Sequence, residues 1–239
     1  MRHGWDAQRP SIPTFFSEAY STAVAETFQF AAEVLTASTN IQDNVCMVMT
    51  DKKCPGPVKI NFDNILANPT PVVGDALAAY FVNNNYGISV LSQSSPNSVG
   101  IVDARCEYGG CAVNAAVIAS SPPNIFTQFD GTASGTNSYT LGFSSPLTSF
   151  SFTRVELVAG GNGITHPQWT AQAFNAGGQL IAGVGEGLIA SFTNVPPASY
   201  TLGPVAGQTI SAVTISGNAF NFAAFGSPIL DDFVLTYGP

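Results

Sequence analysis

Two oppositely charged residues, Arg154 and Glu156, stand two positions apart in a part of the chain that has almost no charge. Within residues 131–230 the only other charged side chain is Glu186. A charge-assisted pair of this kind could orient a hydroxylated ligand at the mouth of a polar cleft on the concave face of a sheet. Because strand side chains alternate, both residues share a face with the apolar Phe152, so the alternative is a surface ion pair at a β-bulge.

His166 and Trp169 are further candidates for ligand binding. An exposed Trp offers a flat apolar face to a sugar ring and a polar N–H at its edge, and His166 could recognise hydroxyl groups beside it. Trp169 is also in phase with Ala171 and Ala173, which favours packing in the core. Both roles therefore remain open for Trp169.

A short polar loop, Asn83–Tyr86, ends in an aromatic residue. Amide side chains both donate and accept hydrogen bonds, which suits the hydroxyl groups of a glycan. Asn84 and Tyr86 are therefore candidate ligand-binding residues. A plain turn is the alternative, because Asn is frequent in turns.

No catalytic motif is found in the sequence. It contains no G-x-S-x-G, no H-E-x-x-H and no phosphate-binding loop. A Ser/His/Asp triad would have to use His3 or His166. Glycoside hydrolysis needs two carboxyl groups across a cleft, and Glu156 with Glu186 is the only pair in the charge-poor region. We therefore predict that the protein is not an enzyme.

The charge content excludes several classes of partner. Only 9% of the 239 residues are charged, against about 25% in an ordinary soluble domain. The net charge is −8 and there are 7 basic residues, too few to neutralise a run of phosphates, so nucleic acid is excluded. Polar residues interrupt every apolar stretch before 18 residues, so we predict no membrane span.

The cysteines form two close pairs in the sequence, Cys46 with Cys54 and Cys106 with Cys111. Four cysteines allow three connectivities, of which we favour these two local disulfides; free thiols are the alternative. The spacings do not fit a zinc site. Disulfides accompany oxidising compartments, so we expect an extracellular or cell-surface protein. Residues 1–10 are polar and no signal-like apolar region follows, so we expect a processed or recombinant chain.

The first part of the chain is predicted to be helical. Residues 13–37 place apolar side chains at spacings of three and four, which is typical of an amphipathic helix. Its apolar face requires a partner, either the rest of this chain or a neighbouring subunit. We divide the chain into a helical segment, residues 1–55, and a β-sandwich domain, residues 56–239, at the turn-forming sequence around Pro55 and Pro57.

The second part predicts short strands separated by turn residues. Thr and Ser solvate a strand surface readily, whereas a helix surface needs Lys and Glu. Strands at this spacing without intervening helices predict an all-β, antiparallel sandwich. The expected strands are Val58–Phe62, Gly87–Gln93, Asn124–Phe129, Ser138–Ser144, Leu147–Val158, Gln168–Asn175, Gln179–Val184, Leu188–Thr193, Ala198–Leu202, Thr209–Ile215 and Ile229–Tyr237.

Several stretches resemble bacterial exported jelly-roll domains of the kind found in proteins with a PEP-type sorting signal, which are similar in build to carbohydrate-binding modules. The resemblance covers residues 58–237 and implies a jelly-roll β-sandwich; its motifs bear on architecture more than on activity. It does not extend to residues 1–55. The stretches are Val58–Asn64, Ser121–Asn124, Ser138–Phe152, Trp169–Leu180, Ala212–Ser216 and Ile229–Leu235.

The resemblance also implies a structural Ca²⁺ site. In the resembling folds the first and last strands are neighbours, and acidic oxygens beside them join backbone carbonyls around calcium. Here those acids are Asp63, Asp231 and Asp232. Calcium prefers six to eight oxygen ligands. Alternation places Asp231 and Asp232 on opposite faces, so at most one points directly into such a site; solvated strand-end acids are the alternative.

Two functions follow from these observations. The first is a non-catalytic extracellular or cell-surface module that binds a polysaccharide or glycan through Arg154, Glu156, His166, Trp169 or the Asn83–Tyr86 loop. The second is a self-assembling structural subunit of a surface layer, fibre or extracellular matrix, whose N-terminal helix docks onto another copy. A surface with little charge opposes such association only weakly.

Overall fold

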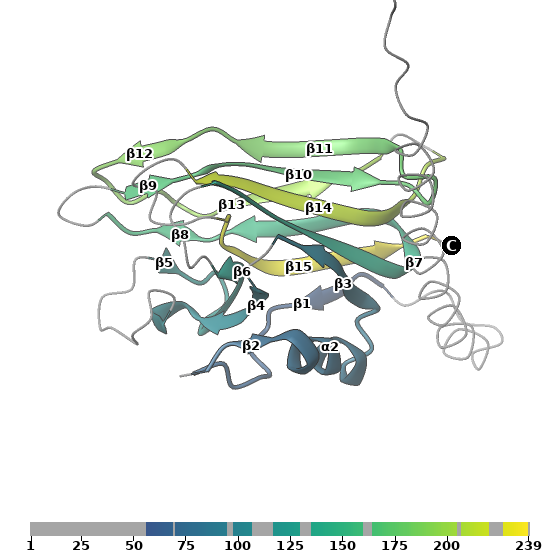
Figure 1. The fold of residues 1–239 in the computed structure, drawn as a ribbon, viewed down its shortest axis with the longest axis horizontal. Coiled ribbons are helices and arrows are strands. Elements are labelled where there is room, and N and C mark those ends of the chain that lie inside the picture. Colours follow the sequence, from purple (N-terminus) through teal and green to yellow (C-terminus); the bar gives the residue numbers. More distant parts are fainter. Residues whose placement is uncertain are drawn as a thin grey trace, which may run out of the picture.

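The computed structural model describes residues 56–68, 70–94, 98–106, 117–129, 135–159, 164–204, 207–219 and 227–238. These residues fold as an antiparallel β-sandwich with one α-helix on its lower side (Figure 1). The predicted all-β class is confirmed. The predicted N-terminal helix and Cys46, Cys54 and Cys111 lie outside the described residues, so both predicted disulfides stay predictions.

One hydrogen-bonded sheet of 11 strands folds over into two layers. The layer nearer the viewer in Figure 1, the front layer, contains β11 (Leu180–Glu186), β10 (Gln168–Phe174), β14 (Ile210–Ala219), the first half of β7 (Gly135–Arg154) and β3 (Ile88–Gln93). The back layer contains β13 (Ala198–Leu202), the second half of β7 and β15 (Leu230–Tyr237). From β15 the sheet continues to β1 (Val58–Ile60) and, through β6 (Asn124–Phe129), to β4 (Ser98–Asp103) and β2 (Val72–Val73).

Strand β7 belongs to both layers. Leu141 is the ladder partner of Val213 in the front layer, and Phe150 is the partner of Leu235 in the back layer. The sequence predicted two strands with a turn at Ser145 and Pro146, and this was wrong. The β14 ladder shifts register beside Pro146, so the missing N–H of the proline falls at an irregularity, where a sheet tolerates it.

Four fully buried phenylalanines hold the two ends of the chain's β region together. The ring centroid of Phe233 on β15 lies 5.0 Å from that of Phe62, 5.2 Å from that of Phe126 and 5.1 Å from that of Phe150. Phe62 has a positive φ of 61°, a turn directly after β1 that sends its ring into the core. The residues on either side of it, Asn61 and Asp63, are thereby left near the surface.

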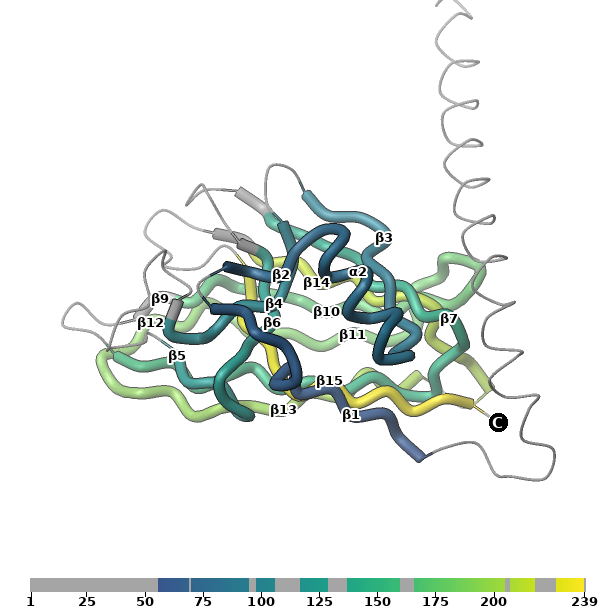
Figure 2. The backbone as a smooth tube through the Cα atoms, turned by 90° about the horizontal axis from the view of Figure 1, so that it is seen from below, coloured from purple at the N-terminus to yellow at the C-terminus, as the bar shows by residue number. Residues whose placement is uncertain are grey.

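The helix α2 (Gly74–Asn83) was not predicted from the sequence. Its buried residues, Leu77, Tyr80 and Phe81, pack toward β2, β3 and β4. It lies on the lower side of the sandwich and faces the viewer in Figure 2. The buried stripe spans little more than one turn, and alanines occupy much of the exposed side, so the segment lacks the periodic polar face that reveals an amphipathic helix.

A smaller hydrophobic cluster closes the left end of the sandwich in Figure 1. It lies beneath the short strands β5 (Val117–Ile118), β8 (Glu156–Leu157), β9 (Ile164–His166) and β12 (Ile189–Ser191). Its buried residues are Val102, Ala104, Val117, Ala119, Ile125, Val155, Leu157 and Ile229. No helix in the described part of the chain has the length and apolar character needed to cross a membrane.

Candidate functional site

Arg154 is buried and forms its ion pair with Glu186, not with Glu156. Its Nε lies 3.0 Å from Oε2 of Glu186 and its Nη2 lies 3.1 Å from Oε1. The guanidinium also donates to the backbone carbonyls of Val155 and Pro196. The predicted Arg154–Glu156 pair was therefore wrong. Arg154 ends β7 on the inward face, and a break at Val155 separates it from Glu156 on β8.

Trp169 is a core residue and presents no face to a ligand. It is 1% exposed, and its ring packs edge-on against Phe152 and Tyr200 at centroid distances of 5.8 and 5.1 Å. Its indole N–H donates to Glu186 at 2.8 Å, and the hydroxyl of Tyr200 donates to the same carboxylate at 2.5 Å. The stacking role predicted for Trp169 was wrong, and the packing alternative is confirmed.

The carboxylate of Glu186 is the common hydrogen-bond acceptor of this internal cluster. Burial alone would raise its pKa, but the hydrogen bonds from Arg154, Tyr200 and Trp169 outweigh burial and hold the pKa below its usual value. The carboxylate therefore stays ionised as the partner of Arg154. Its side chain is 15% exposed, and its bonds are committed to these three residues.

His166 lies beside the same cluster and is fully buried. Burial lowers its pKa to about 4, and the positive charge of Arg154 opposes protonation as well, although Glu186 favours it. The imidazole is therefore neutral at ordinary pH. A fully buried ring cannot meet a glycan, so the predicted ligand role of His166 was wrong. Glu156 is half-buried and receives a long hydrogen bond of 3.4 Å from Asn194.

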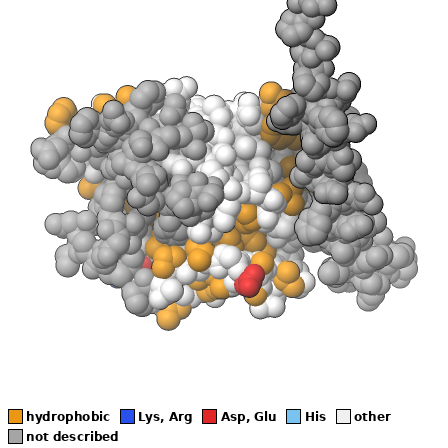
Figure 3. Space-filling model, in the orientation of Figure 1, with side chains coloured by type: hydrophobic (Ala, Val, Ile, Leu, Met, Phe, Trp, Pro, Cys, Tyr) orange, Lys and Arg blue, Asp and Glu red, His pale blue; other side chains and the backbone are white. Residues whose placement is uncertain are grey.

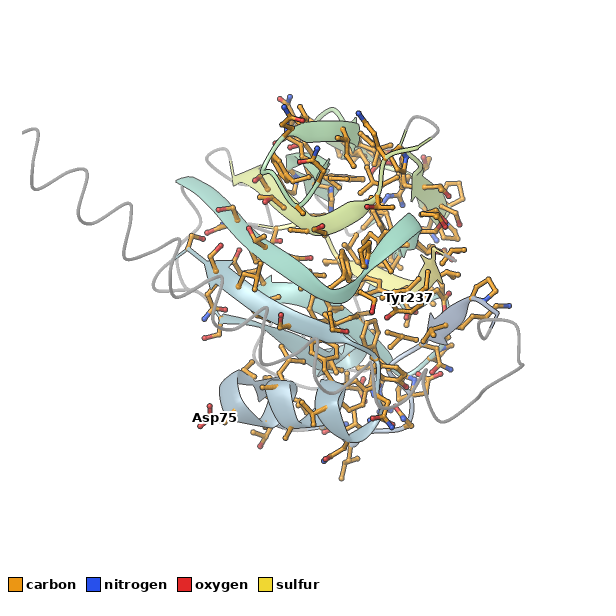
Figure 4. All side chains as sticks on the ribbon, turned by 90° about the vertical axis from the view of Figure 1, so that its right-hand side faces the viewer. Asp75 and Tyr237 are labelled. Carbon is orange, nitrogen blue, oxygen red and sulfur yellow. The ribbon has the colours of Figure 1, made fainter. Side chains whose placement is uncertain are left out.

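Asn84 and Tyr86 lie in an accessible polar cluster at the C-terminal end of α2. Nδ2 of Asn64 donates to Oδ1 of Asn84 at 2.9 Å, and Oδ1 of Asn64 accepts from the hydroxyl of Tyr80 at 2.6 Å. The carbonyl of Tyr86 accepts from the hydroxyl of Tyr237, labelled in Figure 4, at 2.9 Å. The structure thus brings these two predicted residues together beside Asn64, which the sequence prediction did not include.

Two of the three predicted calcium ligands, Asp231 and Asp232, lie in the first residues of β15, and the third, Asp63, lies just after the end of β1. Those strands are antiparallel neighbours, with Ile60 opposite Phe233, as the resemblance implied. The hydroxyl of Ser121 lies 2.8 Å from Oδ1 of Asp232 and 3.2 Å from both carboxylate oxygens of Asp231. It also lies 3.4 Å from the carbonyl of Asn61. Hard oxygens therefore converge here, as a calcium site requires.

The electrostatics of this acidic cluster are unfavourable without a cation. Burial and the neighbouring charge of Asp232 raise the pKa of Asp231 to about 7, although hydrogen bonds from Ser121 oppose the shift. Burial and Asp232 also raise the pKa of Asp63, although a backbone hydrogen bond from Asn124 opposes the shift. Within the described ranges no three His, Cys, Asp or Glu side chains are arranged as a preformed metal site. The oxygen donors are of the kind that calcium prefers, and calcium would need further oxygen ligands to reach a coordination number of about six to eight.

A surface that the sequence analysis did not single out lies on the outside of the front layer. On β10, Gln168 and Thr170 are exposed, and they alternate with the buried Trp169. Thr170 is the ladder partner of Ser216 on β14, which is the partner of Ser138 on β7, so three hydroxyl groups form a row across three strands. We call the outward set the hydroxyl face; it comprises Ser138, Thr140, Gln168, Thr170, Gln172, Thr214 and Ser216.

A second row runs parallel to the first. Gln172, Thr214 and Thr140 are successive ladder partners, and the hydroxyls of Thr140 and Thr214 lie 2.9 Å apart. Gly183 and Gly185 of β11 are the next partners in the two rows and have no side chains, so nothing rises above the strand at this edge of the face. Figure 3 shows the middle of the face in white, without acidic or basic side chains. The alternation of Thr and Gln with buried residues was the signal available in the sequence.

The opposite side of the sandwich also presents hydroxyl groups, paired as Thr140 and Thr214 are. Ser151 and Thr201 lie 2.8 Å apart, and Thr153 and Ser199 lie 3.2 Å apart, so these hydroxyls bond to one another. Lys59 of β1 is the ladder partner of Val234, which is the partner of Ser151, so a charge lies two strands away from them. We call these four residues the back hydroxyls. The hydroxyl face differs by having free amide groups and no charge.

Comparisons with known proteins identify no close relative: no family model and no curated protein sequence matches the chain. Solved structures with some likeness include an MgGH51 α-L-arabinofuranosidase, at 11% identity over 75% of this chain and 26% of that chain, with a TM-score of 0.40. A Stig cyclase from Fischerella sp. TAU matches at 11% identity over 80% of this chain and 92% of that chain, with a TM-score of 0.36.

A third similar structure is TmCBM27, a carbohydrate-binding module that recognises mannan. It matches at 9% identity over 77% of this chain and 100% of that chain, with a TM-score of 0.35. The chain spans about a quarter of the arabinofuranosidase, 26% of its length. Because these identities and TM-scores are low, we base no ligand and no activity on them. The sorting-signal context of the resembling proteins stays a prediction.

Proposed function

We propose that this protein is a non-catalytic extracellular module that binds an uncharged polysaccharide on the hydroxyl face. The observation that supports the proposal is the pair of registered rows of hydroxyl and amide groups, Thr170 with Ser216 and Ser138, and Gln172 with Thr214, on a surface without charge. Sugar hydroxyls both donate and accept hydrogen bonds, and Ser, Thr and Gln side chains do the same.

The extent of the rows, which cross three strands, favours a polymer over a small ligand. Small ligands are held in concave sites that bury most of their surface. An extended chain can instead place successive sugar units over successive strands, which are about 4.8 Å apart. The contacts are individually weak and act together. The hydrogen bonds committed at Glu186 also favour binding over glycoside hydrolysis, since they occupy one carboxylate of the only carboxyl pair in this region.

Affinity electrophoresis against neutral polysaccharides tests the proposal. We expect retardation by at least one of xylan, mannan, β-glucan and dextran, and weaker retardation of the variant Thr140→Val/Thr214→Val. Each lost hydroxyl contact is worth about 1 kcal/mol, so the double variant should bind at least tenfold more weakly. The matched control is Ser151→Ala/Thr201→Val, which removes a bonded pair of back hydroxyls. No retardation of the wild type, or equal loss in both variants, would contradict the proposal.

The cluster of Asn64, Asn84 and Tyr86 is a second candidate contact for the same class of ligand. Its amides and phenol are accessible, and Tyr237 fixes the backbone of Tyr86. The variant Asn84→Ala/Tyr86→Ala, titrated with the polysaccharide that the wild type binds, measures its share. Unchanged affinity would exclude this cluster.

We also propose a structural Ca²⁺ at the acidic cluster. Support comes from the carboxylates of Asp231 and Asp232, the Ser121 hydroxyl between them, and the carboxylate of Asp63, whose pKa the charge of Asp232 raises. A cation there would relieve the repulsion between neighbouring carboxylates. Calorimetric titration after chelation should show binding that Asp63→Asn abolishes. The matched control is Asp75→Asn, which removes an exposed carboxylate on α2, labelled in Figure 4.

Self-assembly stays the alternative prediction. Light scattering of the chain with and without residues 1–55 distinguishes the two functions. A monomer in both forms would remove the assembly alternative, whereas oligomers formed only with residues 1–55 would support it.

A further inference from the structure

Strand β12 and the residues on either side of it expose an apolar stripe. Leu188 is 50% exposed and Phe192 is 79% exposed, and Ala190 between them is exposed as well. Ile189 points the other way and packs against the smaller hydrophobic cluster. Figure 3 shows a few separate hydrophobic side chains along the upper left edge, the side on which β12 lies in Figure 1. Large exposed apolar side chains that share a face often mark a binding surface.

The stripe is held in place by ordered backbone. Ile189 is the ladder partner of His166, whose ring is fully buried. Beyond the strand, the amide of Thr193 donates to the hydroxyl of Ser191 at 3.1 Å, and that hydroxyl lies 3.1 Å from the carbonyl of Thr193. Phe192 stands between these two residues. The turn therefore presents its ring to solvent in a defined position.

The stripe continues the outer surface that contains the hydroxyl face. Strands β9 and β10 are separated by one residue, and β11 and β12 by two, so the β9–β12 pair, a separate two-stranded sheet, directly follows the β10–β11 hairpin along one ribbon. Along this ribbon the inward residues are Trp169 and His166, and the hydroxyl face and the stripe occupy the other side. From Gly185, the partner of Thr170, to Phe192 the chain extends roughly 20 Å.

We propose that the stripe of Leu188, Ala190 and Phe192 is an apolar platform at the end of the polysaccharide site. The ring of Phe192 stacks on one sugar unit while other units of the same chain lie on the hydroxyl face. The inference rests on the proposed function and adds that the ligand is an extended oligomer. The apolar C–H face of a pyranose packs on an aromatic ring, and the exposed ring of Phe192 is the only large aromatic side chain more than half exposed in the described part of the chain. A disaccharide is too short to contact both regions.

Isothermal titration with oligosaccharides of different length tests this platform. The probes are xylohexaose, mannohexaose and cellohexaose with their disaccharides, applied to the wild type, Phe192→Ala and Phe192→Trp. For a hexasaccharide that the wild type binds, we expect Phe192→Ala to weaken affinity about tenfold and Phe192→Trp to restore it. Disaccharide affinity should not change. The matched control is Leu66→Ala, which removes a side chain that is 84% exposed elsewhere.

The outcomes separate this inference from the proposed function. If the wild type binds a hexasaccharide and Phe192→Ala binds it equally well, the platform is wrong and the hydroxyl face stands. If no neutral saccharide binds the wild type, both fail. Two further measurements cover other occupants: loss of a dimer in sedimentation, or loss of flotation with phosphatidylcholine vesicles, caused by Phe192→Ala without a change in saccharide affinity, would overturn the platform.

Discussion

The guanidinium of Arg154 pairs with the carboxylate of Glu186, 32 residues further along the chain, inside the end of the sandwich. Arg154 lies between the two hydrophobic clusters, since Phe152 belongs to the larger and Val155 to the smaller. Its side chain is 3% exposed. Two charges in such a place must be kept together, because either one alone would be buried without compensation.

Removing the acidic partner should therefore be costly. We expect Glu186→Ala to lower the free energy of unfolding by about 3 kcal/mol or more, since it strands the Arg154 charge and leaves Trp169 and Tyr200 without their acceptor. Urea denaturation measures the change. Glu156→Ala is the control, and we expect it to cost less than about 0.5 kcal/mol. Equal costs for the two variants would contradict the assignment.

Two glycines on β11 should differ in their tolerance of a methyl group. A Cβ on Gly185 would lie 2.4 Å from the carbonyl oxygen of Trp169, whereas the nearest atom to a Cβ on Gly183 is 3.7 Å away. The first contact involves backbone and cannot be relieved by rotating a side chain. We expect Gly185→Ala to lower the melting temperature by several degrees and Gly183→Ala to leave it within about a degree. Calorimetry that ranks them in reverse would contradict this geometry.

Stability should fall on the acid side because of His166. Its pKa is lowered to about 4 by burial, against 6.5 for an unhindered histidine, so the unfolded chain binds the proton more readily. The resulting contribution is present above pH 6.5 and is lost as the pH falls toward 4, by on the order of 2–3 kcal/mol. Denaturation at several pH values should show a shallower decline in His166→Gln. An unchanged slope would show that other groups control acid unfolding.

Asp231 acts in the opposite direction. Because burial raises its pKa to about 7, the folded chain holds the proton more tightly than the unfolded chain does. Its contribution therefore lowers stability as the pH rises from about 4 to 7, and calcium should reverse the loss by favouring the ionised form. We expect the stabilisation by calcium, measured as a shift in melting temperature, to be larger at pH 8 than at pH 5. A calcium effect independent of pH would exclude Asp231 as a ligand.

Binding to the hydroxyl face should be insensitive to salt. Screening weakens interactions between charges, and this face presents none to a neutral polymer. We expect affinity for a neutral polysaccharide to stay within twofold between 0.05 and about 0.5 M salt. The variant Thr214→Lys places a charge in the middle of the face and should introduce salt dependence toward an acidic polysaccharide. A steep salt dependence of the wild type would point to another surface.

The β architecture could be predicted because alternation is a local property. Asn124–Phe129 and Ala198–Leu202 were predicted with the bounds that β6 and β13 have. The neighbouring placement of β1 and β15 followed from the resemblance. The continuity of β7 was missed, because Ser145 and Pro146 favour a turn locally and only the partner strands show that the ladder continues.

The site predictions failed where burial decided the outcome. Arg154 was chosen as a charge in a neutral region, and Trp169 and His166 as groups that could stack on or recognise a sugar, yet the three side chains form one internal cluster around Glu186. A two-residue spacing cannot show that Arg154 reaches a partner on another strand. The hydroxyl face consists of common residues, Thr, Ser and Gln. Their alignment depends on strand register, which the sequence does not show.

The 20-residue strand β7 runs through both layers, so the alternation of its side chains links the inward and outward faces of one layer to those of the other. Its first half aligns Ser138 and Thr140 with β14, and its second half directs Phe150 and Phe152 into the core and Arg154 toward Glu186. A deletion of one residue near Pro146 would turn over every side chain on one side of the change relative to the other. The rows of surface hydroxyls and the interior charge pair thus depend on the register of one strand. We therefore expect insertions and deletions to be tolerated in the loops and not in β7.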